Sequence, residues 1–432
     1  MYGGGIFTSQ TKTLPGVYIN VQSKPTSEVT TSTGVCAIGM QMDWCADKAI
    51  TIITAQDFKD NSLSIIGYDS DSSNANAQKL REIFKNAVKC YVFKVNGNCV
   101  KATCTYATAK YGGTRGNALS LLITDDVDVA DTFDVTTYLD GVAVDYQKAV
   151  VIATVEDNDW VVFGSTEFVA SATEVDFSGG TQGDTVDVAD YNDMLTEIAS
   201  INDINIVIND VSTVGSDNVN ALFSSWLADQ RDNLGRKLQL VVYNYSADYE
   251  GVIDCYNSVN MVYWIGGALA GCQLNTSIQG KIYDGEFTIA GAYTSATLAL
   301  ALEAGKMVLQ KDNDNLRVLD DINSLTTFTE DKNSDFHYNQ TIRALDYLAN
   351  TLKDKFVDDY LGKIQNNSSG RASFRSDIIT ILDGMVNDGY LSGYDKSILT
   401  VVQGDTPRVI VVNLGITPPV SMSQAYITIL VG

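Results

Sequence analysis

The sequence predicts an α/β protein whose core is interrupted by an all-β insertion, followed by an α+β domain and flanked by two extended arms. Strands and helices alternate before residue 96 and again after residue 181, as in an α/β core. Between these stretches the chain shows short alternating strands without a helical pattern, and both ends carry strand patterns outside the core. The predicted parts are an N-terminal arm at 1–33, a core at 34–96 and 181–325, an inserted β-sandwich at 97–180, a C-terminal domain at 326–414 and a C-terminal arm at 415–432.

The core begins with an apolar strand at 35–40, a helix at 77–88 and a second strand at 91–95. The helix is amphipathic because its apolar residues recur at helical spacing. They are Leu80, Ile83, Phe84, Ala87 and Val88. After the insertion we expect a helix at 191–199, a strand at 204–208, a helix at 219–230 whose Leu222, Phe223, Trp226 and Leu227 point inward, and a strand at 238–243.

The insertion is recognised by short strands such as 118–123 and 160–163, with turn signals between them. Residues 97–178 contain 13 acidic and 4 basic residues, a net charge of −9. Residues 326–432 contain 12 acidic and 9 basic residues, a net charge of −3. This asymmetry suggests that the insertion faces solvent.

The C-terminal domain is expected to contain a long helix at 341–364, a second helix at 375–386 and an apolar strand at 409–412. One apolar stripe of the long helix should be buried. It consists of Ile342, Leu345, Ala349, Leu352, Phe356, Tyr360 and Ile364.

Each arm carries alternating apolar residues beyond a stretch rich in Gly, Pro, Ser and Thr. Extended segments of this kind can add to the free edge of a neighbouring sheet. The residues expected to exchange between subunits are Val17, Tyr18, Ile19, Val21, Tyr426, Ile427, Ile429, Leu430 and Val431. The alternative is that both strands pair within their own subunit.

Composition excludes several classes of partner. The net charge of −24 argues against binding nucleic acid or anionic lipid. No apolar run is long enough to span a membrane and no secretory signal is recognised, so we expect a soluble protein made in a reducing cytoplasm. Seven cysteines without a C-x-x-C pair favour small core residues over disulfides or a zinc site.

The sequence offers little for catalysis, and we expect no enzyme, metal or cofactor. Its single histidine, His337, lies in a polar stretch and is interpreted as structural. The acidic clusters at 69–71 and 312–314 lack the glycine and glutamate of a calcium loop and are interpreted as turns. Glycoside hydrolysis needs a pair of carboxylates, and the spacing of the acidic residues in this sequence singles out no such pair.

Several segments together resemble contractile tail sheath proteins, which occur in myophages, phage-tail-like bacteriocins and defective prophages. Their order and spacing along the chain carry the resemblance. They are 14–18, 113–117, 266–271, 275–277, 283–286, 321–327, 343–346, 360–363 and 367–371.

The resemblance implies a structural subunit with a subtilisin-like core topology, in which no protease triad can form because His337 lies outside the core. It implies stacked six-fold rings around a tail tube, arms exchanged between neighbours, and contraction between two packings of nearly rigid domains. The expected partners are further copies of the chain, the tail tube protein, and baseplate and tail-terminator proteins. The particle would be a virion or a bacteriocin assembled in the bacterial host cytoplasm.

A basic cluster on or after the long helix is the candidate contact with the tube. It comprises Lys353, Lys363, Arg371 and Arg375. Ten residues separate Lys353 from Lys363, so both would lie on one broad flank of the helix. Alternatively, these lysines and Lys355, which lies further around the helix, pair with Asp354, Asp358 and Asp359 and contribute little. Two other classes of function remain open, a non-contractile surface or adhesin protein and a carboxylate-dependent hydrolase.

Overall fold

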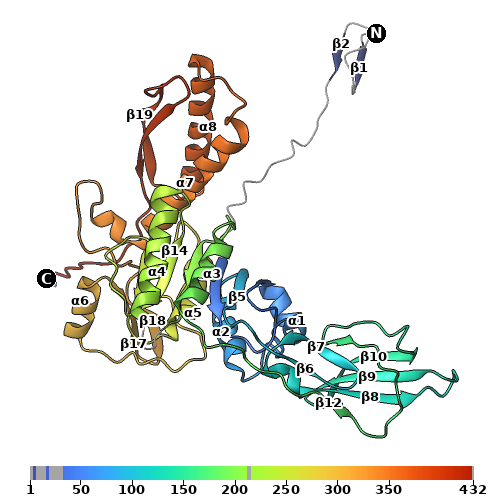
Figure 1. The fold of residues 1–432 in the computed structure, drawn as a ribbon. Coiled ribbons are helices and arrows are strands. Elements are labelled where there is room, and N and C mark those ends of the chain that lie inside the picture. Colours follow the sequence, from blue (N-terminus) through green and yellow to red (C-terminus); the bar gives the residue numbers. More distant parts are fainter. Residues whose placement is uncertain (1–2, 6–15, 19–32, 212–215, 431–432) are drawn as a thin grey trace.

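The computed structural model describes the chain except for residues 1–2, 6–15, 19–32, 212–215 and 431–432. Figure 1 shows the β-rich insertion at one end of the molecule, the α/β core in the middle and a helical domain with a β-hairpin at the other end. The predicted α/β core, inserted sandwich and C-terminal α+β domain are therefore present. The subtilisin-like topology of the core stays a prediction.

A seven-stranded sheet forms the centre of the core. Its strands, in spatial order, are β16 (Lys306–Met307), β15 (Val252–Cys255), β14 (Gln239–Tyr243), β13 (Ile206–Ile208), β3 (Val35–Met40), β5 (Lys89–Lys94) and β4 (Ile50–Thr54). All neighbouring strands are parallel except β4 and β5. Every residue of β3, β13 and β15 is buried, as expected for a parallel sheet covered on both faces.

Two pairs of helices cover the two faces of this sheet. Helices α2 (Ala75–Phe84) and α5 (Met261–Ala270) pack on one face, and α3 (Val188–Ile198) and α4 (Ser216–Ala228) pack on the other. All ten residues of α5 are buried. Gly267 allows α5 to approach α2 closely, because a Cβ atom there would lie 2.3 Å from the Ile83 carbonyl oxygen.

Several expectations for the core need correction. The first half also contains β4 and α1 (Ala55–Ile66), which the sequence pattern missed because β4 is short and half-buried. The first predicted helix ends at Phe84, so Val88 lies outside it and is 55% exposed. Beyond α5, the core adds α6 (Ser295–Glu303) and the hairpin of β17 (Leu309–Asp312) and β18 (Asn315–Val318). The acidic cluster at 312–314 forms the turn of this hairpin, as predicted.

The insertion is a sandwich of a four-stranded and a three-stranded sheet. The first contains β10 (Val142–Val150), β9 (Phe133–Leu139), β8 (Leu119–Asp125) and β12 (Val175–Asp176); the second contains β11 (Val161–Phe163), β7 (Ala107–Gly112) and β6 (Lys101–Thr103). Arg115 connects the sandwich to the core by donating to the Gly67 carbonyl oxygen at 2.6 Å while it pairs with Asp140 at 2.7 Å.

The C-terminal domain contains two helices and an antiparallel hairpin. They are α7 (Asn339–Asp359), α8 (Ser368–Asn387), β19 (Gly393–Gln403) and β20 (Ile410–Thr417). The long helix ends five residues earlier than predicted. Gly362 adopts a left-handed φ of 72°, so the chain turns and Ile364 is 51% exposed instead of buried. The second helix begins seven residues earlier than predicted, where Asn367 caps it, and β19 was missed.

Candidate assembly surfaces

The C-terminal arm lies outside every strand over its described residues 418–430. Tyr426, Ile427, Ile429 and Leu430 are 92%, 81%, 81% and 91% exposed. Pairing of this arm within its own subunit is therefore not seen among the residues that the structure describes. The predicted start of the arm needs correction, because residues 415–417 belong to β20. Val431 lies outside the described residues.

The first residues of the same arm are bound to their own subunit. The Ser421 backbone N–H donates to Gln340 Oε1 at 3.0 Å, and Gln279 Nε2 donates to Ser423 Oγ at 2.9 Å. Gln340 belongs to α7, whereas Gln279 belongs to the core. The arm is thus held at its base and projects from there, as Figure 1 shows.

The N-terminal arm is described only in part. Strand β1 (Gly3–Gly5) pairs in parallel with β2 (Gly16–Tyr18), which contains Val17 and Tyr18. Ile19 and Val21 lie outside the described residues. A role of these residues in exchange stays a prediction.

The hairpin of the C-terminal domain offers an edge for an added strand. Strands β19 and β20 form a sheet of two, so each has one edge without a partner strand among the described residues. Helix α8 packs against β19. Ile410, Val412, Leu414 and Ile416 of β20 are packed against the helices on alternate positions of the strand.

A cavity of about 270 Å³ lies at the outer end of this domain. It is bounded by the end of α7, the loop at 360–366, the start of α8 and the start of β20. Phe356, Tyr360, Phe374 and Ile410 supply its apolar lining, and Arg371 and Arg408 supply its cationic groups. The sequence pattern did not reveal this cavity, because its lining comes from four separate segments.

The four candidate tube-facing residues do not form one helical flank. Lys353 lies on α7 and donates to the Leu234 carbonyl oxygen at 3.3 Å, whereas Lys363 follows the helix and donates to the Asp358 carbonyl oxygen. The expected shared flank is wrong because α7 ends at Asp359. Lys363 and Arg371 nevertheless lie near each other in sequence at the outer end of the domain.

Both arginines of that set bind neighbouring oxygens in their own domain. Arg371 Nη1 donates to Asn366 Oδ1 at 2.9 Å, and Arg375 Nε donates to the Leu399 carbonyl oxygen at 3.0 Å. Lys355 pairs with Asp359 at 2.5 Å and with Asp377 at 3.2 Å. A pairing of lysines with aspartates, the alternative interpretation, is therefore present for Lys355.

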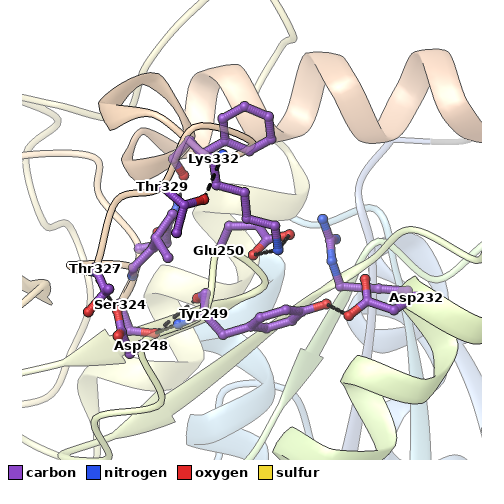
Figure 2. Close-up of polar contacts among 12 residues, drawn as sticks. Asp232, Asp248, Tyr249, Glu250, Ser324, Thr327, Thr329 and Lys332 are labelled. Atoms are coloured by element: carbon purple, nitrogen blue, oxygen red, sulfur yellow. Dashed lines mark hydrogen bonds and ion pairs between the residues drawn. The ribbon is translucent and has the colours of Figure 1, made fainter.

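The segment that leads from the core into the C-terminal domain is held by polar contacts (Figure 2). Asp248 accepts hydrogen bonds from the backbone N–H groups of Thr326 and Thr327 at 2.7 and 2.9 Å. Hydrogen bonds from Thr327 and Thr326 hold the pKa of Asp248 at about 2, since they favour the charged carboxylate. The segment 321–327, which carried part of the resemblance, is thus fixed to the core.

The same segment is held at a second point. Lys332 Nζ lies 2.9 Å from both carboxylate oxygens of Glu250, and Ser324 Oγ donates to the Tyr249 carbonyl oxygen at 3.0 Å. Tyr249 in turn donates from its hydroxyl to Asp232 at 3.0 Å. Figure 2 shows these groups gathered around the loop before β15.

Helix α7 contacts the core through a row of polar residues that the apolar pattern did not reveal. The row runs along one side of the helix with spacings of four, three, four and three residues. It consists of Asn339, Arg343, Asp346, Asn350 and Lys353, and is called the polar row below.

Each member of the polar row has a partner in the core. Arg343 pairs with Asp321 at 2.9 Å, and both side chains are less than a tenth exposed. The Asn350 side chain accepts from the Lys237 N–H at 3.1 Å and donates to the Lys237 carbonyl oxygen at 2.9 Å. The signal that could have found the row is this spacing of polar residues beside the apolar stripe.

No group of three or more His, Cys, Asp or Glu side chains that could hold a metal ion occurs in the described part of the chain. His337 lies near the core–domain junction, with Nδ1 2.5 Å from the Leu325 carbonyl oxygen, as a structural histidine would.

Five cysteines are buried and free, and burial raises the pKa of Cys45 to about 12. Cys104 is partly buried and packs against the hydrophobic core, whereas Cys99 is partly buried outside it, so the expectation of core cysteines is wrong for Cys99. None of the described helices is long and apolar enough to cross a membrane.

Three family models match consecutive parts of the chain. They are the phage tail sheath protein beta-sandwich domain at 96–184, the phage tail sheath protein central domain at 184–324 and the phage tail sheath C-terminal domain at 331–432. The chain belongs to the phage tail sheath protein family. Such a protein is a structural component and its family is not an enzyme family.

Among curated relatives of this sheath protein is the phage-like element PBSX protein XkdK of Bacillus subtilis, 29% identical over 388 residues. The match covers 82% of this chain and 81% of the relative. The B. subtilis protein YqbK, which is uncharacterized, is 28% identical over 390 residues, or 81% of each chain.

Solved structures show the same fold. The crystal structure of the sheath tail protein of Desulfitobacterium hafniense has a TM-score of 0.79 at 28% identity, covering 93% of this chain and all of that chain. The sheath tail protein of Listeria innocua has a TM-score of 0.78 at 27% identity, covering 90% and 92%. A chain of the anti-feeding prophage baseplate shares the fold with a TM-score of 0.55 at 13% identity.

Proposed function

We propose that this sheath protein is the subunit of a contractile tail sheath, which polymerises as stacked six-fold rings around a tail tube. Contraction of the sheath would drive the tube through the envelope of a target cell. The observation that carries the proposal is the C-terminal arm. Its apolar residues at 426–430 are almost fully exposed in a single subunit, and burying apolar surface against a neighbour is favourable by roughly 25 cal/mol per Å².

The arms would connect neighbouring subunits by strand addition. A free edge of β19 or β20 presents unpaired N–H and C=O groups, which an extended segment from another copy can satisfy. Each main-chain hydrogen bond contributes roughly 0.5–1.5 kcal/mol, so an arm of five or six residues contributes a few kcal/mol. Head-to-tail contacts of this kind propagate along a helix instead of closing.

Contraction would be a change of packing between subunits whose core and C-terminal domain move together. The buried ion pairs of the polar row support this part of the proposal, because their geometry fits one docking of α7 on the core. The partners would be the tail tube protein, reached through the C-terminal domain, and baseplate and tail-terminator proteins at the sheath ends. The acidic insertion would face outward from a particle assembled in the bacterial cytoplasm.

Deletion of residues 424–432 tests the proposal in the full-length background. The shortened subunit should fold, with an unchanged thermal transition, and fail to form tubes in negative-stain electron microscopy. Deletion of residues 1–22 should give the same result. Val127→Asp is the matched control, since it changes a 94% exposed apolar residue of the insertion and should leave polymerisation intact. Sheath tubes formed by the arm-deleted subunits would contradict the proposal.

A further inference from the structure

We propose that Lys306 and Asn244 become joined by an isopeptide bond within the subunit, with Asp254 as the group that transfers protons. Asn244 follows β14, Asp254 belongs to β15, and Lys306 begins β16, the edge strand of the seven-stranded sheet. The bond would tie this edge of the sheet covalently to the end of β14, across 62 residues of sequence. The inference does not depend on the proposed function.

The lysine amine lies beside both groups that the reaction needs. Lys306 Nζ is 2.7 Å from Asn244 Oδ1 and 3.5 Å from Asp254 Oδ2. A C=O bond is about 1.2 Å long, so the amide carbon of Asn244 lies at most about 3.9 Å from the amine. Reacting atoms in a near-attack arrangement are about 3–3.5 Å apart, so a small rotation of either side chain is sufficient.

Backbone contacts hold the three side chains at this place. Lys306 lies directly opposite Asp254 in the parallel pairing of β15 with β16. The Tyr245 N–H donates to Asp254 Oδ1 at 3.0 Å, which leaves Oδ2 for the amine. The Asn244 N–H donates to the Cys255 carbonyl oxygen at 3.2 Å, and Asn244 adopts a left-handed φ of 52°, which asparagine tolerates. The site is therefore built by the fold and does not rest on one surface contact.

Asp254 has the properties of a proton-transfer group. Its side chain is 1% exposed, and its Oδ2 atom has no hydrogen-bond partner among the described residues. Burial raises the pKa of Asp254, although the nearby Lys306 ammonium opposes this shift. A carboxylate in such surroundings accepts a proton more readily than one in water. In the product, the new amide N–H can donate to Oδ2, which gives this oxygen the partner that it lacks.

The reaction balances without a further reactant. Asp254 takes one proton from the Lys306 ammonium, and the free amine attacks the amide carbon of Asn244. The new C–N bond forms, and the bond from this carbon to Nδ2 breaks. Asp254 gives its proton to Nδ2, which leaves as ammonia, and takes the second proton from the lysine nitrogen, so it ends as a neutral carboxylic acid. Asn244 is exposed, so the ammonia can escape to solvent.

A second contact between a lysine and an asparagine provides a control within the same chain. Lys281 Nζ lies 2.5 Å from Asn86 Oδ1 and 5.7 Å from the centroid of the Trp264 ring. No carboxylate pairs with Lys281 in the part of the chain that the structure describes. Without a group to take its proton, Lys281 stays an ammonium and should form no bond to Asn86.

Mass spectrometry of the full-length chain tests the proposal. After incubation at neutral pH, the intact mass should be lower than that of the unmodified sequence by one molecule of ammonia. Trypsin should no longer cleave after Lys306 and should release a branched peptide that joins residues 238–281 to residues 282–311. Cleavage after Lys281 should remain complete in the same digest.

Variants assign the bond to these side chains. Lys306→Arg keeps the positive charge without the reactive amine, and Asn244→Gly removes the amide while it suits the left-handed φ. Both variants should retain the full mass of their sequences. Asp254→Asn should slow bond formation at least tenfold. Asn86→Ala is the matched control and should yield the same branched peptide as the unaltered chain.

Three outcomes would count against the proposal. The full sequence mass together with cleavage after Lys306 would show that the amine forms only a hydrogen bond and an ion pair, and would overturn it. A loss of ammonia without the branched peptide, persisting in Lys306→Arg, would also overturn it and would indicate a succinimide elsewhere, such as at Asn96 before Gly97. A branched peptide formed equally fast by Asp254→Asn would exclude Asp254 from the reaction. Each of these results would leave the proposed sheath function untouched.

Discussion

Arg231 and Asp346 form a two-point ion pair between the core and the C-terminal domain. Arg231 Nη1 lies 2.6 Å from Asp346 Oδ2, and Nη2 lies 2.9 Å from Oδ1. The side chains are 3% and 13% exposed. Arg231 belongs to the short helical turn after α4, whereas Asp346 belongs to the polar row of α7. The two planar groups match in one orientation, so the pair fixes the position of α7 on the core.

Removing one partner of this pair should destabilise the subunit strongly. Arg231→Met leaves the buried Asp346 carboxylate without its counter-charge, which costs about 3–5 kcal/mol. Chemical denaturation should show this loss, and limited proteolysis should cleave the segment at 324–332 faster. The matched control is Lys110→Met, which removes a partly exposed partner of Asp159 and should cost less than about 1 kcal/mol. An unchanged denaturation midpoint for Arg231→Met would show that the pair does not hold the two parts together.

Acid should release the segment that connects the core to the C-terminal domain. The pKa of Asp248 in the folded chain is about 2, below its ordinary value of 3.8. A lowered folded-state pKa means that the stabilisation is present above about pH 4 and is lost as the pH falls through about 2. Hydrogen exchange of the Thr326 and Thr327 amides should therefore accelerate over this range, beyond the intrinsic pH effect.

Asp248→Asn is the control for this prediction. The amide keeps one oxygen acceptor but loses the charge, so the two threonine amides should already be less protected at neutral pH. Their protection should then show little further dependence on pH between 4 and 2. Equal protection in both proteins at all pH values would mean that the carboxylate charge does not hold this segment.

Helices and strands were predicted correctly where their burial shows in the sequence as a run or a regular spacing of apolar residues. Strands β3 and β14 are nearly continuous apolar runs because both faces of the parallel sheet are covered. The C-terminal arm, from residue 418 on, was recognised from a Gly- and Pro-containing segment next to alternating apolar residues, whereas most of the predicted N-terminal arm lies outside the described residues. Helix α4 was placed correctly from the inward spacing of Phe223 and Leu227, which are buried.

The contacts between distant segments could not be predicted in the same way. The polar row of α7 carries no apolar signal, and its meaning depends on where Asp321, Arg231 and Lys237 lie in space. The end of α7 was misjudged because the apolar spacing continues through Ile364, while the backbone turns at Gly362. The cavity at the outer end of the C-terminal domain combines residues up to 54 positions apart, from Phe356 to Ile410.

The acidic insertion should be the accessible part of an assembled particle. Its surface contains exposed apolar residues beside many carboxylates, among them Val127 at 94% and Val142 at 66% exposure. Antibodies raised against the isolated full-length protein should label residues 126–131 in intact particles. Labelling of the 360–366 loop should be blocked in particles and recovered in free subunits. The opposite pattern of labelling would contradict this orientation.

The contact with the tail tube should depend on basic residues at the outer part of the C-terminal domain. Lys353 and Lys363 are exposed and each contacts a backbone carbonyl oxygen, so their charges remain available to an acidic partner. Lys353→Glu combined with Lys363→Glu removes the exposed hydrogen bond from Lys353 to the Leu234 carbonyl oxygen and should lower the thermal transition of the subunit only slightly. The variant should form sheath without a tube but should fail to assemble extended sheath on one.

Arg371 is tested separately, because its hydrogen bonds to Asn366 make it part of the loop structure. Arg371→Gln keeps a hydrogen-bond donor and removes the charge, so a loss of tube-dependent assembly with unchanged stability would assign its charge to the tube contact. Lys148→Glu, which reverses an exposed charge in the insertion, is the matched control and should assemble normally.

Rising salt should weaken tube-dependent assembly of the unaltered chain, since exposed charge pairs are screened over about 8–10 Å near physiological ionic strength. Extended tails of normal length from the double lysine variant would exclude these lysines from the contact and leave Arg371 and Arg375 as the remaining candidates.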